Sequence, residues 1–167
     1  MKTPANRRAL LAGAIALTAG LTLAGCSDSS AGKASVSTSD KPELKVSGAY
    51  IPEPVMDTMA SGFFTLTNKG GADKLVSVTS SFAKKVTLHS TKNSAMREQK
   101  SFDVPADGEL DFARGGNHLM FEKLNHKPKP GEKIAVLLRF EKSDPIEVEV
   151  PVKAATYNPE HGKHSAH

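Results

Sequence analysis

The chain of 167 residues carries 22 Lys and Arg against 18 Asp and Glu, with five Met, six His, one Cys and no Trp. This length suits a single domain with short attachments. A single Cys excludes an internal disulfide, a CxxC redox pair and any multi-thiolate zinc or iron–sulfur site. The formal net charge of +4 would suit an acidic partner only if the basic residues belong to the folded domain.

Residues 1–25 have the pattern of an export signal. Three basic residues and no acidic one accompany an apolar run of Ala, Leu and Gly over 9–25, which is too short for a membrane-spanning helix. The run ends at Leu23-Ala24-Gly25-Cys26, which resembles the lipobox of bacterial lipoproteins. There a signal peptidase cuts before the Cys and the thiol takes up lipid. The alternative is an ordinary signal peptide followed by a chance Cys.

Cleavage before Cys26 would remove most of the excess positive charge. The remaining chain would be nearly balanced and would have no basic stripe with interleaved aromatic residues, so nucleic-acid binding loses its support. Lipidation would also consume the only thiol. We therefore expect an extracytoplasmic protein, lipid-anchored at Cys26 to the bacterial cell membrane, with no nucleic-acid partner.

The rest of the chain divides into a tether, one β domain and a tail. Residues 26–42 are small and polar, which is typical of a lipid anchor and flexible tether. Residues 154–167 form a His-containing tail too polar to fold alone. Between them, over 43–153, short runs alternate with turn signals and predict about eight antiparallel strands in a Greek-key β-sandwich or barrel. The expected strands are 44–50, 62–68, 74–79, 85–89, 109–113, 117–124, 133–140 and 146–150.

Strand alternation sorts the His and Met residues of this domain by face. In the strand that ends at His89, the apolar residues take the alternate positions, so His89 faces away from the core. In the strand of His118 and Met120, the intervening and following residues are the apolar ones, so this pair also points away from the core. Met96 lies in a polar stretch where core packing gives no reason for it.

These four side chains converge on one chemistry, although each alone has an ordinary explanation as a surface His or a gap-filling Met. Imidazole and thioether are neutral ligands, and soft thioethers favour Cu(I) over zinc, magnesium or calcium. A blue-copper electron carrier needs a Cys ligand, which the domain lacks. The pattern therefore indicates a Cu(I) site without thiolate.

The segment Gly115-Gly116-Asn117-His118-Leu119-Met120 resembles the GxHLM segment of the PCuAC-type (DUF461) extracytoplasmic copper chaperones. Residues 86–89 resemble the strand that bears their first ligand, and 60–68 with 73–76 resemble their first core strands. The stretches 129–132 and 137–141 also match, so the resemblance covers about 44–152. In that family a His and a Met precede 21 residues and a His-x-Met pair, and here the 21 residues 97–117 follow Met96.

The resemblance implies a cupredoxin-like fold and a chaperone that delivers copper to the binuclear copper site of cytochrome c oxidase. Its partners would be subunit II of that oxidase and a Sco-type copper chaperone, and we expect a monomer. Only six residues separate the first His from the first Met, where the family usually has about eleven. A shortened hairpin loop could still bring His89 to the site. The implied Cu(I) ligands are His89, Met96, His118 and Met120.

Other residues leave alternatives open. Met56 and Met59 could contact copper, although packing is the simpler expectation, and His126 lies in a turn. The protein could be a metal buffer that sequesters copper, or a lipoprotein binding module without metal. An enzyme is not expected, because the domain has no Cys nucleophile, Ser/His/Asp motif or phosphate-binding glycine loop. The tail offers a secondary Cu(II) site, or a solvated segment with incidental imidazoles, at His161, His164 and His167.

Overall fold

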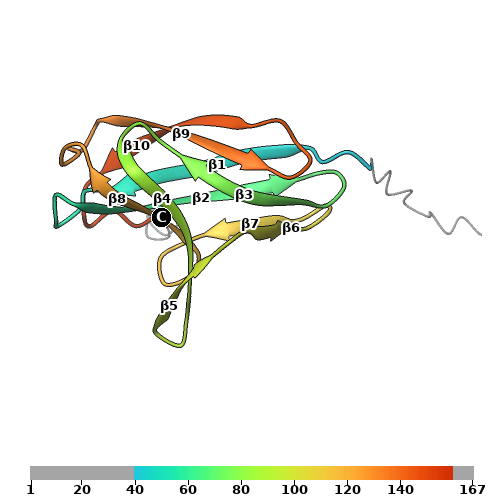
Figure 1. Cartoon of the computed structure of the whole chain (residues 1–167), viewed down its shortest axis with the longest axis horizontal. Helices are drawn as coiled ribbons and strands as arrows, with labels where there is room; N and C mark the ends of the chain where they lie inside the picture. The colour runs from blue at the N-terminus through green and yellow to red at the C-terminus, as the bar shows by residue number, and fades with distance from the viewer. Residues whose placement is uncertain (1–39, 160–167) are drawn as a thin grey trace, which may run out of the picture. The chain divides into compact units, whose positions relative to one another are not determined.

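The computed structural model describes residues 40–159, and its regular structure consists of β-strands without an α-helix. The expectation of an all-β fold is confirmed. Figure 1 shows the strands wrapped around a common interior. In chain order they are β1 (Leu44–Pro52), β2 (Met59–Asn68), β3 (Asp73–Thr79), β4 (Ala83–Lys92), β5 (Ala95–Gln99), β6 (Phe102–Val104), β7 (Glu109–Phe112), β8 (His118–Leu124), β9 (Lys133–Phe140) and β10 (Ile146–Lys153).

The strands pair in the order β5-β4-β8-β2-β1-β10-β9-β3-β6, and β7 pairs with β2. The sequence predicts about eight strands, all antiparallel, whereas the described residues form ten. The two additional strands, β5 and β6, are short. One pair, β1 with β10, is parallel, with Ile51 opposite Val152. The first and last strands of the domain therefore run side by side in the same direction.

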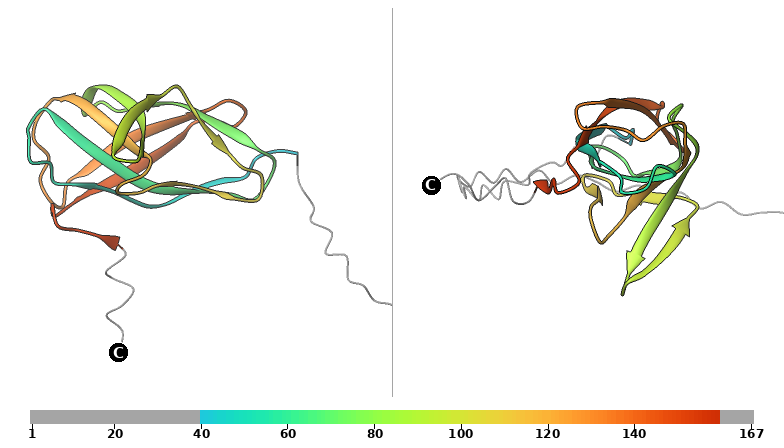
Figure 2. Two further views of the ribbon diagram at one scale, coloured as in Figure 1. Left: turned by 90° about the horizontal axis from the view of Figure 1, so that it is seen from below. Right: turned by 90° about the vertical axis from the view of Figure 1, so that its left-hand side faces the viewer.

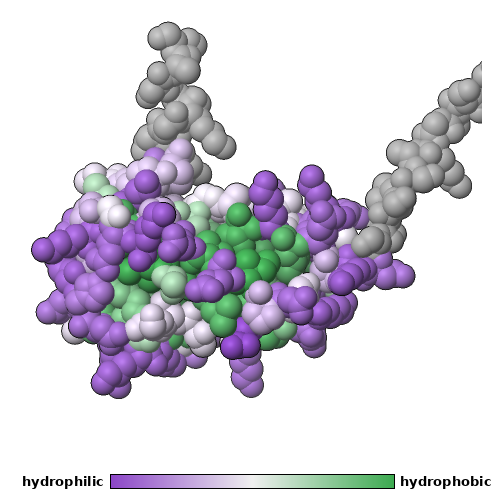
Figure 3. Space-filling view, turned by 90° about the horizontal axis from the view of Figure 1, so that it is seen from above, coloured by the Kyte–Doolittle hydropathy of each residue, from purple (hydrophilic) through white to green (hydrophobic). Residues whose placement is uncertain are grey.

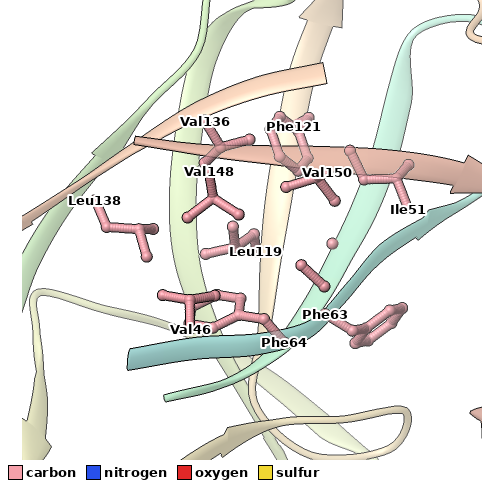
Figure 4. Close-up of a pocket in the computed structure, with 12 residues that line it drawn as sticks. Val46, Ile51, Phe63, Phe64, Leu119, Phe121, Val136, Leu138, Val148 and Val150 are labelled. Atoms are coloured by element: carbon pink, nitrogen blue, oxygen red, sulfur yellow. The ribbon is translucent and has the colours of Figure 1, made fainter. Parts of the chain in front are cut away.

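Alternation along the strands builds one apolar interior, since successive side chains point to opposite faces. Phe121, Ile51, Leu66 and Leu75 are completely buried. Figure 4 shows apolar side chains from β1, β2, β8, β9 and β10 lining a pocket in this interior. Leu119 and Phe121 anchor β8 in this interior, and β8 is the strand that carries two of the predicted copper ligands.

The β4–β5 hairpin projects from the rest of the domain (Figures 1 and 2). Its turn residues Asn93 and Ser94 both have positive φ, 50° and 63°, as a two-residue type I′ turn requires. The β5 strand lies at the edge of the sheet, and most of its side chains are exposed. A tight turn therefore spans the short interval between His89 and Met96.

Hydrophilic residues surround an apolar area on the face of the domain drawn in Figure 3. Within residues 40–159, no helix is both long and apolar enough to cross a membrane. The chain after β10 lies against the domain, because Arg114 Nη2 donates to the carbonyls of Ala155 and Tyr157, at 3.2 Å each. The Tyr157 ring also meets Tyr50 edge-on, at 5.0 Å between centroids. The predicted lipidation residue Cys26 and the tail residues His161, His164 and His167 lie outside the described residues.

Candidate metal centre

Two imidazoles meet across the neighbouring strands β4 and β8. His89 lies directly opposite His118 in the antiparallel register. Residues opposite each other in such a pair share a face of the sheet. The ring centroids are 5.5 Å apart and the ring planes are inclined by 29°. The sheet thus brings together two histidines that lie far apart in the sequence.

The two thioethers of the predicted ligand set lie on the same face. Met120 is opposite Thr87 on β4, one alternate position from the histidine pair. Met96 is opposite Thr91 at the far side of β4, so it is the diagonal neighbour of His89. Diagonal neighbours have Cα atoms about 7–8 Å apart, within reach of long side chains. All four predicted ligands therefore share one face of β4, β5 and β8.

Burial differs among these four residues. His118 is only 6% exposed, which is more buried than the alternation alone predicts for a residue facing away from the core. His89 and Met120 are half-buried, whereas Met96 is 54% exposed. The imidazoles therefore lie in the inner part of the candidate centre and the Met96 thioether at its solvent edge.

Each imidazole uses one ring nitrogen in a hydrogen bond and leaves the other without a partner. His118 Nδ1 lies 3.1 Å from the carbonyl oxygen of Gly116, and His89 Nε2 lies 3.0 Å from Thr87 Oγ1. The other two nitrogens, His89 Nδ1 and His118 Nε2, are buried and have no hydrogen-bond partner among the described residues. Leaving a buried polar atom unpaired costs about 1–3 kcal/mol. A metal ion would give both atoms a partner.

The electrostatic surroundings keep the His89 imidazole in its neutral, ligating form. Burial lowers the pKa of His89, and the neighbouring His118 lowers it further. Glu98 and Glu122 act in the opposite direction without reversing the result. Both carboxylates lie near Lys85, whose Nζ is 3.6 Å from Glu98 and 3.9 Å from Glu122.

The donor set suits a soft, monovalent metal better than a hard or divalent one. Among the described residues, no group of three or more His, Cys, Asp and Glu side chains could hold a metal ion. Two imidazoles and two thioethers add no negative charge, and thioether sulfur favours Cu(I). The unpartnered nitrogens on a face with two methionines therefore fit Cu(I).

The remaining candidates lie away from the histidine pair or carry other contacts. Met56 and Met59 are 54% and 39% exposed, so neither is a core residue. Met59 is opposite Glu122 on β8, which places it on the same face as Met120. His126 is engaged elsewhere, because its Nε2 lies 2.6 Å from Glu132 Oε1.

Sequence reasoning missed the residues that hold the imidazoles in place. Thr87 and Gly116 each lie two positions before the histidine that they contact. A Thr two residues before a ligating His on a strand shares its face, so Thr87 could have been singled out. The carbonyl of Gly116 could not, because its direction depends on the turn before β8.

The sequence matches a known family over most of the β domain. The family model described as "Putative lipoprotein LpqE-like" matches residues 44–152. The chain is also 39% identical over 116 residues to "Putative lipoprotein Lxx21020" of Leifsonia xyli subsp. xyli (strain CTCB07), an alignment that covers 66% of this chain and 69% of that protein.

Several solved structures have the same fold. The apo PCuAC domain of PmoF2 is 20% identical, with a TM-score of 0.60, over 68% of this chain and 92% of that one. The apo PCuAC domain of PmoF1 is 24% identical, with a TM-score of 0.61, over 66% and 93%. The Cu(I) form of DR1885 from Deinococcus radiodurans is 24% identical, with a TM-score of 0.56, over 75% and 85%. The cupredoxin-like fold that the resemblance implies is thereby confirmed.

Proposed function

This chain belongs to the LpqE-like family, and we propose that it is an extracytoplasmic copper chaperone. The observation that carries the proposal is the pair of buried, unpartnered imidazole nitrogens, His89 Nδ1 and His118 Nε2. They lie on a sheet face that also presents Met96 and Met120. We propose that these four side chains bind Cu(I) as the protein's cargo.

The fold supports the proposal without carrying it. Structures with the same fold are named as a copper-bound PCuAC domain from PmoF2 and as the Cu(I) form of DR1885. Because these proteins have low identity to this chain, their likeness extends to the fold alone, and function depends on the site. The ligand assignment here therefore rests on this chain's own register, burial and hydrogen bonds.

The unequal burial of the ligands suggests how copper would be released. His118 is held by the Gly116 carbonyl on a strand packed against the core, whereas Met96 is half exposed on an edge strand. An incoming thiolate or imidazole can therefore replace the Met96 thioether first, while the histidines keep their hold on the metal. We propose that the acceptor is the binuclear copper site of cytochrome c oxidase, with subunit II and a Sco-type chaperone as partners.

Two parts of the proposal concern residues outside 40–159. Cys26 would carry the lipid that anchors the protein to the bacterial cell membrane, in keeping with the lipoprotein descriptions of its family and relative. His161, His164 and His167 would capture Cu(II), because imidazole clusters suit divalent copper better than Cu(I). Mass spectrometry of the protein from membranes tests the first part, and Cu(II) binding after substitution of the three histidines tests the second.

An anaerobic Cu(I) titration against a competing chelator tests the site itself. The triple variant Met96→Leu, His118→Leu, Met120→Leu keeps side-chain volume and removes three of the four ligands. We expect its affinity to fall by more than about 100-fold, since loss of outer-shell groups alone costs about 10–100-fold.

Matched controls separate ligand loss from general effects of substitution. Met56 is 54% exposed, as Met96 is, and His126 has its ring nitrogen engaged by Glu132. Met56→Leu and His126→Leu should both bind Cu(I) as the unaltered protein does. An unaltered affinity in the triple variant would contradict the site, and failure of the loaded protein to restore copper to apo subunit II would contradict delivery.

A further inference from the structure

Thr87, Glu122 and Lys85 form a series of contacts that begins at the His89 ring, on the face that carries the candidate centre. Thr87 Oγ1 lies 3.0 Å from His89 Nε2 and 3.4 Å from Glu122 Oε1. Glu122 Oε1 is in turn 3.9 Å from Lys85 Nζ. The Thr87 hydroxyl is buried, since the residue is only 7% exposed. This series of contacts crosses from β4 to β8 and back.

The hydroxyl of Thr87 has one proton, so its two contacts cannot both be donated bonds. An ionised carboxylate only accepts hydrogen bonds, and therefore the hydroxyl donates to Glu122 and accepts from His89. This arrangement puts the imidazole proton on His89 Nε2 and leaves the lone pair on Nδ1. The opposite tautomer would place an N–H at the buried Nδ1, which has no acceptor among the described residues.

His118 has the reverse arrangement. Its Nδ1 faces the carbonyl of Gly116 at 3.1 Å, and a carbonyl oxygen only accepts hydrogen bonds. The proton therefore lies on Nδ1, and the lone pair lies on Nε2, which is buried and unpartnered. The two stacked histidines thus present different ring atoms: Nδ1 from His89 and Nε2 from His118.

We propose that Thr87 is a positioning residue that fixes the tautomer of His89, so that the metal is bound through His89 Nδ1 and His118 Nε2. The inference rests on the proposed copper site and extends it to the atoms that bind. Outer-shell hydrogen bonds that set a ligand's tautomer and orientation typically change metal affinity by about 10–100-fold. Glu122 acts through Thr87 by accepting a hydrogen bond from its hydroxyl.

The tautomers can be measured without any metal, so the role of Thr87 and the copper site itself can be tested separately. Long-range ¹H–¹⁵N correlation spectra of the apo protein distinguish a protonated ring nitrogen from one with a lone pair. We expect His89 to be protonated at Nε2 and His118 at Nδ1. Addition of Ag(I), a redox-inert substitute for Cu(I), should then shift His89 Nδ1 and His118 Nε2.

Two substitutions at Thr87 and one elsewhere complete the experiment. Thr87→Val keeps the β-branched shape without the hydroxyl, and it should give a mixture of His89 tautomers and about tenfold weaker Cu(I) binding. Thr87→Ser should restore both. Thr67→Val is the matched control, because the Thr67 hydroxyl also donates to a carboxylate, at 3.2 Å from Glu109 Oε1, but contacts neither histidine.

Each outcome tests either the role of Thr87 or the copper site itself. A protonated His89 Nδ1 in the apo protein, a larger metal-induced shift at His89 Nε2 than at Nδ1, or an unchanged tautomer in Thr87→Val would overturn the role of Thr87 while leaving a copper site. If Ag(I) perturbs neither histidine, the proposed copper site itself is wrong. An equal loss of affinity in Thr67→Val would show that the effect of Thr87→Val is structural.

Discussion

Replacing the buried His118, one of the proposed copper ligands, with Leu should stabilise the apo protein. In the folded state His118 is 6% exposed, and its Nε2 has no hydrogen-bond partner among the described residues. That unpaired atom costs about 1–3 kcal/mol. Leu has a similar volume and no polar atoms, so the substitution removes this cost without opening a large cavity.

The opposing loss is small. His118→Leu removes the hydrogen bond from Nδ1 to the Gly116 carbonyl, worth about 1 kcal/mol. The carbonyl keeps a second partner, because the backbone N–H of Thr91 donates to it at 3.1 Å. The net expectation is a gain of about 1 kcal/mol, which corresponds to about 4 °C in Tm for a domain of this size.

Thermal and urea unfolding of the chelator-treated protein measure the effect. Cu(I) should raise the Tm of the unaltered protein, because a ligand that binds only the folded state stabilises it, and it should raise the Tm of His118→Leu much less. The control His126→Leu removes an exposed contact with Glu132 and should change stability by less than about 1 kcal/mol. A clear loss of apo stability in His118→Leu would refute the claim that this residue is kept for binding at a cost in stability.

Three further predictions concern acid sensitivity and the core beneath the centre. Burial raises the pKa of Asp73, but hydrogen bonds from the Ser143 hydroxyl and three backbone N–H groups outweigh it and lower the pKa overall. The resulting stabilisation is complete above the unfolded pKa, about 3.8, and is lost as the pH falls through the folded value. Asp73→Asn should therefore cost about 2 kcal/mol at pH 7 and flatten the acid profile of urea unfolding, and an unchanged profile would contradict this. For His89, burial and then the nearby His118 lower the pKa below 6.5. Protonation of His89 should therefore begin only at lower pH than in a free imidazole, and a His89 ring that already gains its proton at pH 7 in an NMR titration of the apo protein would count against it. The apo protein should lose stability in the same direction, because the folded state prefers neutral His89. Finally, Phe121 is fully buried, and its sequence neighbours Met120 and Glu122 lie on the face of the candidate centre. Phe121→Ala should therefore lower the free energy of unfolding by about 3–5 kcal/mol in urea. A loss below about 1 kcal/mol would mean that this core is not tightly packed.

Alternating apolar residues made most of the fold predictable. The strand of His118 has apolar residues at alternate positions, and these are buried as the pattern requires. The β5 strand has no such pattern, because its side chains are mostly exposed and pairing with β4 alone defines it. Its turn requires positive φ at both Asn93 and Ser94. Asn adopts this conformation readily, but a Ser in the sequence gives no indication of it.

The candidate centre was predictable as a set of residue types and not as a geometry. Local alternation places His118 and Met120 on one face. It cannot place His89 opposite His118, because that depends on the register between β4 and β8. Nor can it show that Thr87 contacts Glu122, since this contact joins strands through the same register.

X-ray absorption at the copper edge of the reduced, copper-loaded protein identifies the atoms that bind the metal. With one equivalent of Cu(I), we expect two imidazole nitrogens and two thioether sulfurs from His89, His118, Met96 and Met120. The sulfur contribution should fall by about half in Met96→Leu, because one of two equivalent scatterers is removed. A coordination shell of nitrogen and oxygen alone, or one unchanged by His118→Leu, would show that the proposed copper site is wrong.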